Sequence, residues 1–327
     1  MPSEIRAMSG GLRVAVVMGG PSGEHDISLK SGHGVAEALA KRGWRVESIA
    51  IPKAVSLEQA RGVARDALQH AAPEVVFIAL HGAFGEDGTI QQVCEELHLA
   101  YTGSDVQASR LGMDKVASRR RFEAAGLHVP RWRLIDLEAA HSAALRTVVR
   151  DFPCPLVVKP PDQGSSLGVS IVRREEELAQ ALAHAGQYGP HVLIEEFVSG
   201  REMTVGVLGD DPLPIVEIRP TQPFFDFTAK YTVGMTEYVV PAPLAPDAAQ
   251  RVQAAGLVAH RALGCRHLSR TDMIVRHDGV PVVLEVNTIP GFTPTSLVPK
   301  AAACLHIAYE ELCERLALMA VQSPAHV

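Results

Sequence analysis

Hydrophobic positions recur in two rhythms along the first hundred residues. Short runs that are almost wholly apolar predict buried strands, and they lie at 14–18, 45–51 and 75–80. The segments that follow them have the helical spacing of apolar residues, and they lie at 26–42, 57–69 and 89–98. Strand–helix alternation of this kind predicts a parallel sheet with right-handed crossovers. We therefore expect residues 1–103 to form an N-terminal α/β domain.

Two glycine-rich loops follow the first and third of these strands. They read GGPSGEHD (19–26) and HGAFGEDG (81–88). The carboxyl ends of parallel strands share one edge of the sheet, where α/β folds bind ligands, so we expect the two loops to lie together. The first loop is not a dinucleotide fingerprint, because Pro21 stands where that motif needs glycine. The chain has no Walker A motif, since no lysine follows a glycine.

The pattern changes beyond residue 104. Residues 114–126 predict a helix that ends at Gly126, and later runs have the mixed character of an α+β fold. Strands are predicted at 155–159, 168–172, 191–196, 202–208 and 215–220, and helices at 175–185, 247–263 and 300–320. We expect two α+β units, a central one over 104–196 and a C-terminal one over 197–327.

The stretch 220–246 has no periodicity and is rich in Pro, Phe and Tyr. An aperiodic segment of this length within a compact domain is usually functional. We interpret it as a lid over a binding site.

The segment RTDMIVRHDGVPVVLEVN (270–287) predicts a hairpin, because Asp-Gly is a strong two-residue turn signal. With a loop of Asp278 and Gly279, Asp272 lies opposite Glu285 on the ladder. Facing carboxylates repel each other, and a bridging cation removes that repulsion. Oxygen ligands suit Mg²⁺, which binds few protein groups together with substrate phosphates. A solvent-exposed polar face, or a one-residue slip with another turn, is the alternative.

Candidate phosphate and nucleoside contacts lie upstream. Lys159 ends a strand and is followed by the Gly/Ser loop 164–168, whose amides and hydroxyls could fold over phosphates. The segment IEEFVSGRE (194–202) resembles a linker between two sheets, whose backbone could bind adenine and whose Glu202 could bind ribose. Taken alone, the loop could be an ordinary turn and the acidic residues ordinary surface charges.

Composition narrows the function classes. The chain has 327 residues, 47% hydrophobic and 21% charged, as is typical of a folded protein. A net charge of −6 argues against a general nucleic-acid binder, and the one dense basic run, Arg119–Arg121, is interpreted as a solvated helix face.

The five cysteines form no C-x-x-C pair, which indicates a reducing compartment. We see no signal-peptide pattern and no apolar run of membrane-spanning length. We expect a cytoplasmic protein with neither membrane nor nucleic-acid partner.

Taken together, the motifs resemble those of the D-alanine–D-alanine ligases of the ATP-grasp superfamily, from about residue 12 to 320. The resemblance is carried by nine ordered motifs: GGPSGEHDISL (19–29), HGAFGEDGT (81–89), YTGS (101–104), MDK (113–115), VVKPPDQGSSLGVS (157–170), IEEFVSGREMTV (194–205), FDFTAKY (225–231), SRTDMI (269–274) and LEVNTIPGFTPTSLVP (284–299). It implies a Rossmann-like (pre-ATP-grasp) domain followed by the two α+β subdomains of an ATP-grasp fold.

The resemblance also implies a reaction. ATP would phosphorylate the carboxylate of one D-alanine, and the amine of a second D-alanine would attack the acyl phosphate. The products would be D-alanyl-D-alanine for peptidoglycan precursors, ADP and phosphate. Two Mg²⁺ (or Mn²⁺) ions would assist, a monovalent cation is left open, and the protein would be a homodimer.

Residue roles follow from the same resemblance. ATP would be bound by Lys115, Lys159, Lys230, Glu195, Glu196, Phe197, Val198 and Glu202. The metal ions would be held by Asp272, Glu285 and Asn287, in agreement with the hairpin argument. D-Alanine would be bound by Glu24, His81, Arg270, Gly291, Ser296 and Leu297.

Two groups of residues would have catalytic roles. Arg270 and the Gly291 amide would stabilise the oxyanion of the tetrahedral intermediate. Ser165, Tyr231 and Glu24 would form a hydrogen-bonded set that closes the lid.

Single residues have plainer readings too. Glu24 could be a helix-entry charge, His81 a structural histidine, Tyr231 a loop aromatic and Ser296 a helix cap. Phe84 stands where smaller residues are common in the family, so it could alter the lining of the first substrate pocket.

Four other functions are weighed against this one. A D-alanine–D-lactate depsipeptide ligase is disfavoured by Tyr231, because the lid tyrosine is histidine in vancomycin-resistance members. Another ATP-grasp carboxylate–amine ligase would not need Glu24. A regulatory ATP-binding protein would have lost a residue such as Lys159 or Glu285, and a dehydrogenase would need a dinucleotide fingerprint.

Overall fold

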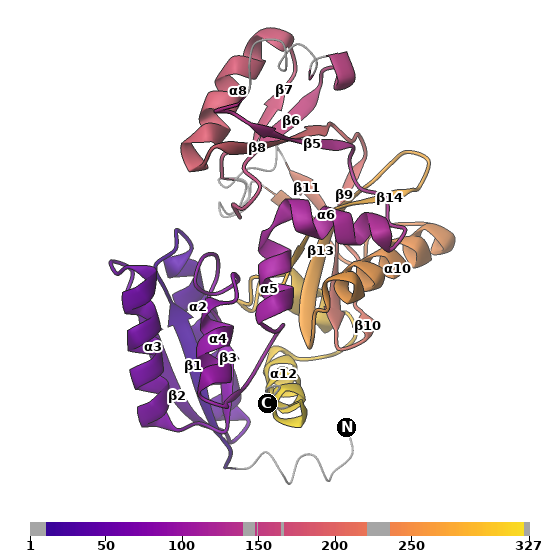
Figure 1. The fold of residues 1–327 in the computed structure, drawn as a ribbon. Coiled ribbons are helices and arrows are strands. Elements are labelled where there is room, and N and C mark those ends of the chain that lie inside the picture. Colours follow the sequence, from indigo (N-terminus) through magenta and orange to yellow (C-terminus); the bar gives the residue numbers. More distant parts are fainter. Residues whose placement is uncertain (1–10, 140–147, 149, 165–166, 221–235, 324–327) are drawn as a thin grey trace.

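The computed structural model describes residues 11–139, 148, 150–164, 167–220 and 236–323. Its strands form three sheets (Figure 1). A parallel sheet near the N-terminus is followed by two antiparallel sheets, which confirms the predicted fold class.

The N-terminal sheet has the order β2–β1–β3–β4, and every pair is parallel. Its strands are β1 (Arg13–Gly19), β2 (Arg45–Ile51), β3 (Val75–Ile78) and β4 (Ala100–Tyr101). The helices between them are α2 (His25–Lys41), α3 (Leu57–Ala71) and α4 (Thr89–Glu96). Six of these seven elements are predicted from the sequence and are confirmed; the two-residue β4 is not.

Alternate side chains of β1 pack into two separate cores. Val14 and Met18 face α2, whereas Val17 faces α3 and α4. A Cβ added at Gly32 of α2 would lie 2.5 Å from the Cβ of Met18. The close approach of α2 to β1 therefore requires glycine at this position.

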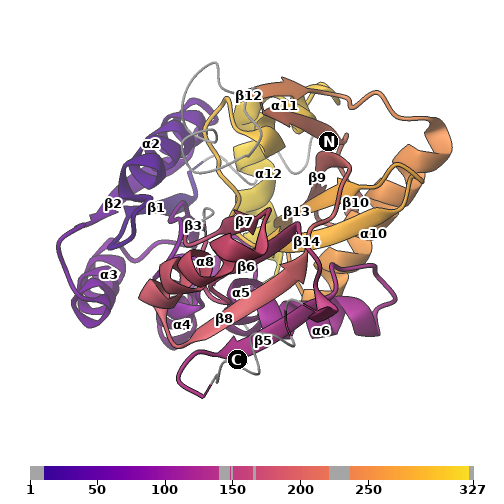
Figure 2. The ribbon, with the colours of Figure 1, turned by 90° about the horizontal axis from the view of Figure 1, so that it is seen from above.

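The C-terminal helix α12 (Tyr309–Gln322) completes the core on the α2 side of this sheet. Arg42, directly after α2, forms an ion pair with Glu314 of α12, whose carboxylate is almost fully buried. The last segment of the chain thus packs on the first domain, beside α2 (Figure 2).

The central sheet has the order β5–β8–β6–β7 and is antiparallel. Its elements are β5 (Trp132–Asp136), β6 (Leu156–Lys159), β7 (Ser170–Val172), η1 (Glu175–Glu177), α8 (Leu178–Ala185), η2 (Gly186–Tyr188) and β8 (His191–Glu196). Leu156 and Val158 pack against α8, so the alternating Val157 and Lys159 face the opposite side.

The C-terminal sheet has the order β12–β11–β9–β13–β14, with β10 paired to β9. Its strands are β9 (Arg201–Leu208), β10 (Asp211–Pro212), β11 (Val216–Pro220), β12 (Thr236–Val239), β13 (Leu268–Val275) and β14 (Pro281–Asn287). Helix α10 (Pro246–Leu263) packs on the face that carries Met203 and Met273. The opposite face, with Glu202 and Asp272, turns toward the central sheet.

Helices α5 (Val106–Met113) and α6 (Lys115–Ala124) also pack on the C-terminal sheet, through Leu111 and Phe122. The predicted boundary at residue 104 groups these helices with the central unit instead. The assignment of 1–103, 104–196 and 197–327 as functional domains stays a prediction.

Two sequence predictions are corrected. Residues 236–239 form β12, so the stretch 220–246 is not wholly irregular; residues 221–235, most of the predicted lid, lie outside the described part. The predicted helix 300–320 is two helices, α11 (Leu297–Ala303) and α12. His306 has a φ of +59°, in the left-handed region, which interrupts a right-handed helix.

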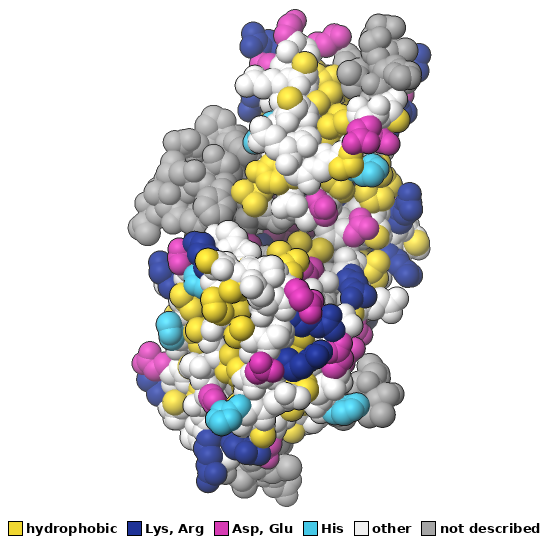
Figure 3. Space-filling view, turned by 60° about the vertical axis from the view of Figure 1, so that its left-hand side comes forward, with side chains coloured by type: hydrophobic (Ala, Val, Ile, Leu, Met, Phe, Trp, Pro, Cys, Tyr) yellow, Lys and Arg dark blue, Asp and Glu magenta, His cyan; other side chains and the backbone are white. Residues whose placement is uncertain are grey.

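The surface has no large region of one charge on the face shown in Figure 3, where acidic and basic side chains are interspersed. Within the described ranges, no helix is both long and apolar enough to cross a membrane. All five cysteines are free thiols.

Candidate active site

A cavity of about 490 Å³ lies between the central and C-terminal sheets. Strands β6, β7 and β8 form one wall, and β9, β11, β13 and β14 the other. Nine of the predicted site residues line it: Lys115, Lys159, Glu195, Glu196, Phe197, Val198, Glu202, Asp272 and Glu285. The fold therefore brings together the described residues that were predicted to bind ATP and two of the three predicted metal ligands.

A buried charge network forms the floor of this cavity. Lys159 Nζ lies 2.8 Å from Glu195 Oε2, and the other oxygen of Glu195 forms an ion pair with Arg119. Burial lowers the pKa of Lys159 to about 8, although the Glu195 carboxylate acts in the opposite direction. Arg119 is completely buried, so its interpretation as part of a solvated basic face is wrong.

The hairpin prediction is confirmed at the residues that matter. Asp272 pairs with Glu285, and Arg270 pairs with Asn287. Arg270 donates to both oxygens of Asp272, at 2.9 and 2.7 Å, and the Thr204 hydroxyl donates to Asp272 Oδ1 at 2.6 Å. Lys115 Nζ lies 3.6 Å from Glu285 Oε2, so both facing carboxylates have cationic neighbours.

The donor set of the hairpin fits a hard cation. Asp272 and Glu285 provide carboxylate oxygens on one cavity wall, and the Asn287 amide oxygen, which accepts from Ile289 N at 3.0 Å, lies two residues beyond Glu285. In the described part of the chain, no three His, Cys, Asp or Glu side chains group as a metal site. Two carboxylates are enough for an ion that also binds substrate phosphates, so these residues could hold Mg²⁺ jointly with a nucleotide.

The two N-terminal glycine-rich loops meet as predicted. The Ser22 hydroxyl donates to the His81 carbonyl at 2.7 Å. His81 Nδ1 lies 3.2 Å from the Ile289 carbonyl, and its Nε2 lies 3.0 Å from the Ser31 hydroxyl. Because a carbonyl only accepts, Nδ1 carries a proton, and burial lowers the pKa of His81, which favours the neutral imidazole.

Glu86 is a second buried acid in this region. Burial, and after it the Glu24 carboxylate, raise its pKa to about 8. Its Oε1 accepts from Gly82 N at 3.0 Å and lies 4.0 Å from His81 Nδ1. Glu24, His81 and Glu86 therefore form one cluster at the edge of the N-terminal sheet, and Arg270 is close enough to influence His81 and Glu86.

Phe84 does not extend into a pocket. Its side chain is completely buried in the core under α3 and α4. Its φ of +75° is in the left-handed region, which costs free energy for a residue with a side chain. The hydrogen bond from Phe84 N to Asp87 Oδ2, at 2.8 Å, helps to hold this conformation.

The segment after β14 is fixed by the C-terminal helix. Tyr309 at the start of α12 donates to the Phe292 carbonyl at 2.7 Å, and the rings of the two residues are in tilted contact with 5.8 Å between their centroids. Within the loop, Ser296 Oγ accepts from Thr293 N at 3.0 Å. A Cβ added at Gly291 would lie 3.4 Å from Ser296 Oγ, so these two predicted substrate-binding residues are neighbours.

The remaining predicted residues divide into two groups. One group is described by the structure but does not line the cavity: Glu24, His81, Arg270, Asn287, Gly291, Ser296 and Leu297. Ser165, Lys230 and Tyr231 lie outside the described residues. Ser296 precedes α11, but its side chain makes no cap hydrogen bond to that helix. The alternative that Ser296 is a side-chain helix cap is therefore wrong.

Three residues at the site were missed by the sequence reasoning. Arg119 follows Lys115 by one helical turn, a spacing that places both on one helix face. Thr204 lies two residues after Glu202 on β9, so the two side chains point to the same face of the sheet. Glu86 lies within a motif that was recognised, but nothing in the sequence indicates its burial.

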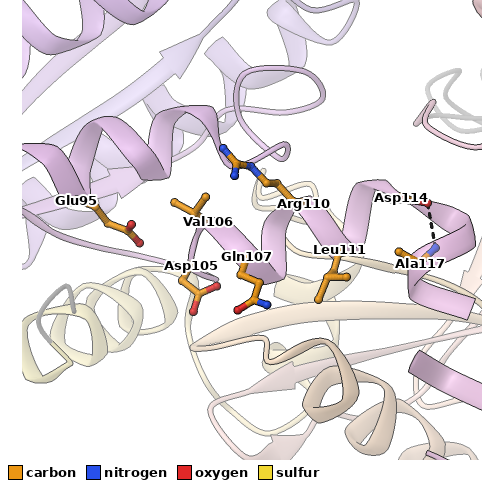
Figure 4. Close-up of a pocket in the computed structure, with 8 residues that line it drawn as sticks. All are labelled: Glu95, Asp105, Val106, Gln107, Arg110, Leu111, Asp114 and Ala117. Carbon is orange, nitrogen blue, oxygen red and sulfur yellow. Dashed lines mark hydrogen bonds between the residues drawn. The ribbon is translucent and has the colours of Figure 1, made fainter. Parts of the chain in front are cut away.

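A second hollow, of about 440 Å³, lies between α4, α5 and α6 (Figure 4). Its acids have structural partners: Asp105 accepts from Ala108 N at 2.8 Å, and Asp114 accepts from Ala117 N at 3.0 Å. It contains no lysine and shares no residue with the cavity between the sheets. We therefore place the active site in the latter.

Comparisons with known proteins identify the family of the chain. Residues 121–318 match the family described as D-ala D-ala ligase C-terminus, and residues 52–104 match D-ala D-ala ligase N-terminus. The D-alanine–D-alanine ligase of Anaeromyxobacter sp. (strain Fw109-5) is 44% identical, over 94% of this chain and 96% of its own.

Solved structures of D-alanine–D-alanine ligases are also similar to this chain. The crystal structure of the Bacillus anthracis D-alanine–D-alanine ligase has a TM-score of 0.81 and 32% identity, with 95% of this chain and 98% of that chain covered. The structure of that ligase complexed with ATP has a TM-score of 0.80, 31% identity and the same coverage.

Two antiparallel sheets that enclose a lysine-lined cavity, beside a parallel-sheet domain, define an ATP-grasp ligase. The match extends through both the N-terminal and the C-terminal family segments. The chain belongs to the D-alanine–D-alanine ligase family.

Proposed function

We propose that this protein joins two D-alanine molecules at the expense of ATP and so forms D-alanyl-D-alanine, ADP and phosphate. The observation that carries the proposal is the cavity in which Lys115, Lys159, Glu202, Asp272 and Glu285 converge from separate segments of the chain. Such a site can bind a polyphosphate and a hard cation together.

Nucleotide binding is assigned to the cavity walls. Lys115 and Lys159 contact the phosphates, the backbone from Glu195 to Val198 contacts adenine, and Glu202 accepts from the ribose hydroxyls. Lys230, outside the described residues, is assigned to the transferring phosphate. Asp272, Glu285 and Asn287 hold Mg²⁺, which supplies charge neutralisation at the phosphates when it is bound.

The first D-alanine is placed at the N-terminal loops. Glu24 binds its ammonium group, and His81 lies beside it as a neutral imidazole. A carboxylate oxygen of this D-alanine attacks the γ-phosphorus of ATP, which gives D-alanyl phosphate and ADP. Ser165 and Tyr231 are assigned to closure of the site with Glu24, because an acyl phosphate must be protected from water.

The second D-alanine is placed at the loop after β14. Ser296 and Leu297 bind its carboxylate, and its amine attacks the acyl carbon. Arg270 and the Gly291 amide stabilise the resulting oxyanion. Phosphate leaves, the amine loses its protons, and the peptide bond forms.

Three properties are proposed from the family resemblance and await their own tests. The protein works in the cytoplasm, it is a homodimer, and its three units have the boundaries given above. Sedimentation equilibrium tests the dimer directly, since a monomer mass at micromolar concentration contradicts it.

The reaction is tested by measuring phosphate release from ATP–Mg²⁺ with different acceptors and by identifying the products by mass. D-Alanine is expected to support release with formation of the dipeptide, and L-alanine is not. A product formed only with D-lactate, or with another amine, would keep the ATP chemistry and replace the substrate assignment.

A further inference from the structure

Arg119 is the one arginine that is fully buried in the described part of the chain. It lies on α6, whereas its neighbours Arg120 and Arg121 are exposed. Its guanidinium forms an ion pair with Glu195, and its Nη1 donates to the Lys115 carbonyl at 3.3 Å. A buried charge is costly unless it has partners, so this placement requires an explanation.

The explanation lies in how Glu195 divides its two oxygens. One oxygen pairs with Arg119, and the other lies 2.8 Å from Lys159. Lys115 adds a third cation, whose neighbour is Glu285 at 3.6 Å. These five groups together carry one more positive than negative charge, beside the place where the phosphates of a nucleotide are proposed to bind.

We infer that Arg119 is a positioning residue for nucleotide binding. By occupying one oxygen of Glu195, it prevents that carboxylate from fully neutralising Lys159 and holds the lysine ammonium at the cavity floor. The inference rests on the proposed function, because it assumes that the cavity receives a nucleotide.

The pH dependence of nucleotide binding distinguishes a positioning role of Arg119 from a role in packing alone. The charged groups that face Lys159 are Glu195 on β8, Arg119 and Lys115 on α6, and Glu285 on β14. Burial is the main cause that lowers the pKa of Lys159, the two cations lower it further, and the two carboxylates raise it. Loss of Arg119 therefore weakens nucleotide binding at neutral pH but raises the pKa of Lys159.

The test is calorimetric titration with ADP–Mg²⁺ at pH 7 to 9.5, using the full chain and its Arg119→Met, Arg119→Lys and Arg121→Met variants. Arg119→Met is expected to weaken binding at pH 7 by roughly 10-fold or more. Its loss of affinity at alkaline pH is expected to begin at higher pH than in the wild type. Arg119→Lys should restore most of the affinity, and Arg121→Met, which removes the same charge from the exposed face of α6, should leave both features unchanged.

Glu195→Gln provides an independent variant if Arg119→Met does not fold. It removes a carboxylate that raises the pKa of Lys159, so its alkaline loss of affinity should begin at lower pH than in the wild type. The opposite directions for Glu195→Gln and Arg119→Met would not result from a general loss of packing.

Two results would overturn the inference. Wild-type affinity in Arg119→Met would show that Arg119 does not act on the nucleotide, and an unchanged pH profile with weakened binding would show a packing role only. Failure of the wild-type protein to bind ADP–Mg²⁺ would overturn the proposed function together with this inference.

Discussion

Asp272 faces Glu285 across the β13–β14 ladder because a bulge corrects the register that the turn sets. Near the turn, Val275 pairs with Pro281, and Met273 pairs with Val283. That register alone would place Leu284 opposite Asp272. The extra residue in β14 brings Glu285 opposite Asp272 instead, and Leu284 lines the same cavity.

The facing carboxylates predict a shared dependence on the proposed metal ion. Asp272→Asn or Glu285→Gln should each lower turnover by about 10² or more, because each removes charge that would position the proposed cation at the transition state. The apparent Mg²⁺ affinity should fall in both. Since the two residues act on one site, the double variant should lose much less than the product of the single effects.

Steady-state rates at varied Mg²⁺ concentration measure this coupling. Thr204→Val, which removes only the hydroxyl 2.6 Å from Asp272 Oδ1, should have a smaller effect in the same direction. Full additivity of the two carboxylate substitutions would contradict a common metal site.

The buried acid Glu86 predicts a pH-dependent stability. Its pKa is raised to about 8 in the folded protein, so between about pH 4.5 and 8 the folded state binds more protons than the unfolded state. The contribution of Glu86 to the free energy of unfolding therefore falls as pH rises through this window, by up to ~1.4 kcal/mol per pH unit. Glu86→Gln removes this dependence.

Urea unfolding of the wild type and Glu86→Gln at pH 5, 6, 7 and 8 compares the two profiles. The stability of Glu86→Gln relative to the wild type should increase with pH. Parallel profiles would mean that Glu86 is ionised in the folded protein.

The link from α12 to the loop after β14, where the second D-alanine is proposed to bind, predicts a measurable cost for the loss of one hydroxyl group. Tyr309→Phe removes the donor to the Phe292 carbonyl but keeps the ring contact. It should destabilise the protein by about 1 kcal/mol and raise the KM of the second D-alanine. Tyr309→Leu should cost more, because the ring contact is lost as well. Thermal unfolding measures the change in stability, and D-alanine kinetics measure the KM. An unaltered KM in both variants would show that the contact of Tyr309 with the loop after β14 does not affect D-alanine binding.

A cation–π contact predicts coupling between β12 and α11. Lys300 Nζ lies 4.6 Å from the centroid of the Tyr238 ring, an interaction worth about 0.5–2 kcal/mol. In a double-mutant cycle, Lys300→Met and Tyr238→Leu should show a coupling energy in this range, whereas Tyr238→Phe should retain it. A coupling energy of zero in denaturant unfolding would rule the contact out.

Helices and strands were predictable where the local spacing of hydrophobic residues is regular. Strands such as 45–51 and 191–196 have unambiguous patterns, and the structure has the same bounds for both. The position of α12 on the N-terminal sheet was not predictable, because it depends on a pairing across the whole chain, such as that of Arg42 with Glu314.

The hairpin shows a different limit. Asp272 was correctly placed opposite Glu285, but through a two-residue turn that the structure does not have. The hydrogen bond between Arg276 N and the Val280 carbonyl closes a longer loop, and the bulge at Leu284 restores the pairing. The sequence pattern predicts which face of the sheet a residue lies on. A longer turn shifts the pairing by one residue and the bulge shifts it back, so the pattern at Asp272 and Glu285 is the same with or without both.

Arg119 shows why composition misleads at a site. A run of three arginines normally indicates a solvated surface, and two of the three are exposed. The third is buried because a carboxylate from β8 and a neighbouring lysine lie beneath the same helix face. Only the tertiary structure places Glu195 there.

In the proposed reaction, the protein transfers the γ-phosphoryl group of ATP to the carboxylate of D-alanine and then forms a peptide bond. The most direct measurement uses ATP–Mg²⁺ with D-alanine that carries ¹⁸O in its carboxylate. We expect each phosphate released to contain one ¹⁸O atom, together with one D-alanyl-D-alanine, because the carboxylate oxygen that attacks ATP leaves with the phosphate. Phosphate without ¹⁸O, or phosphate without dipeptide, would contradict the acyl-phosphate ligase.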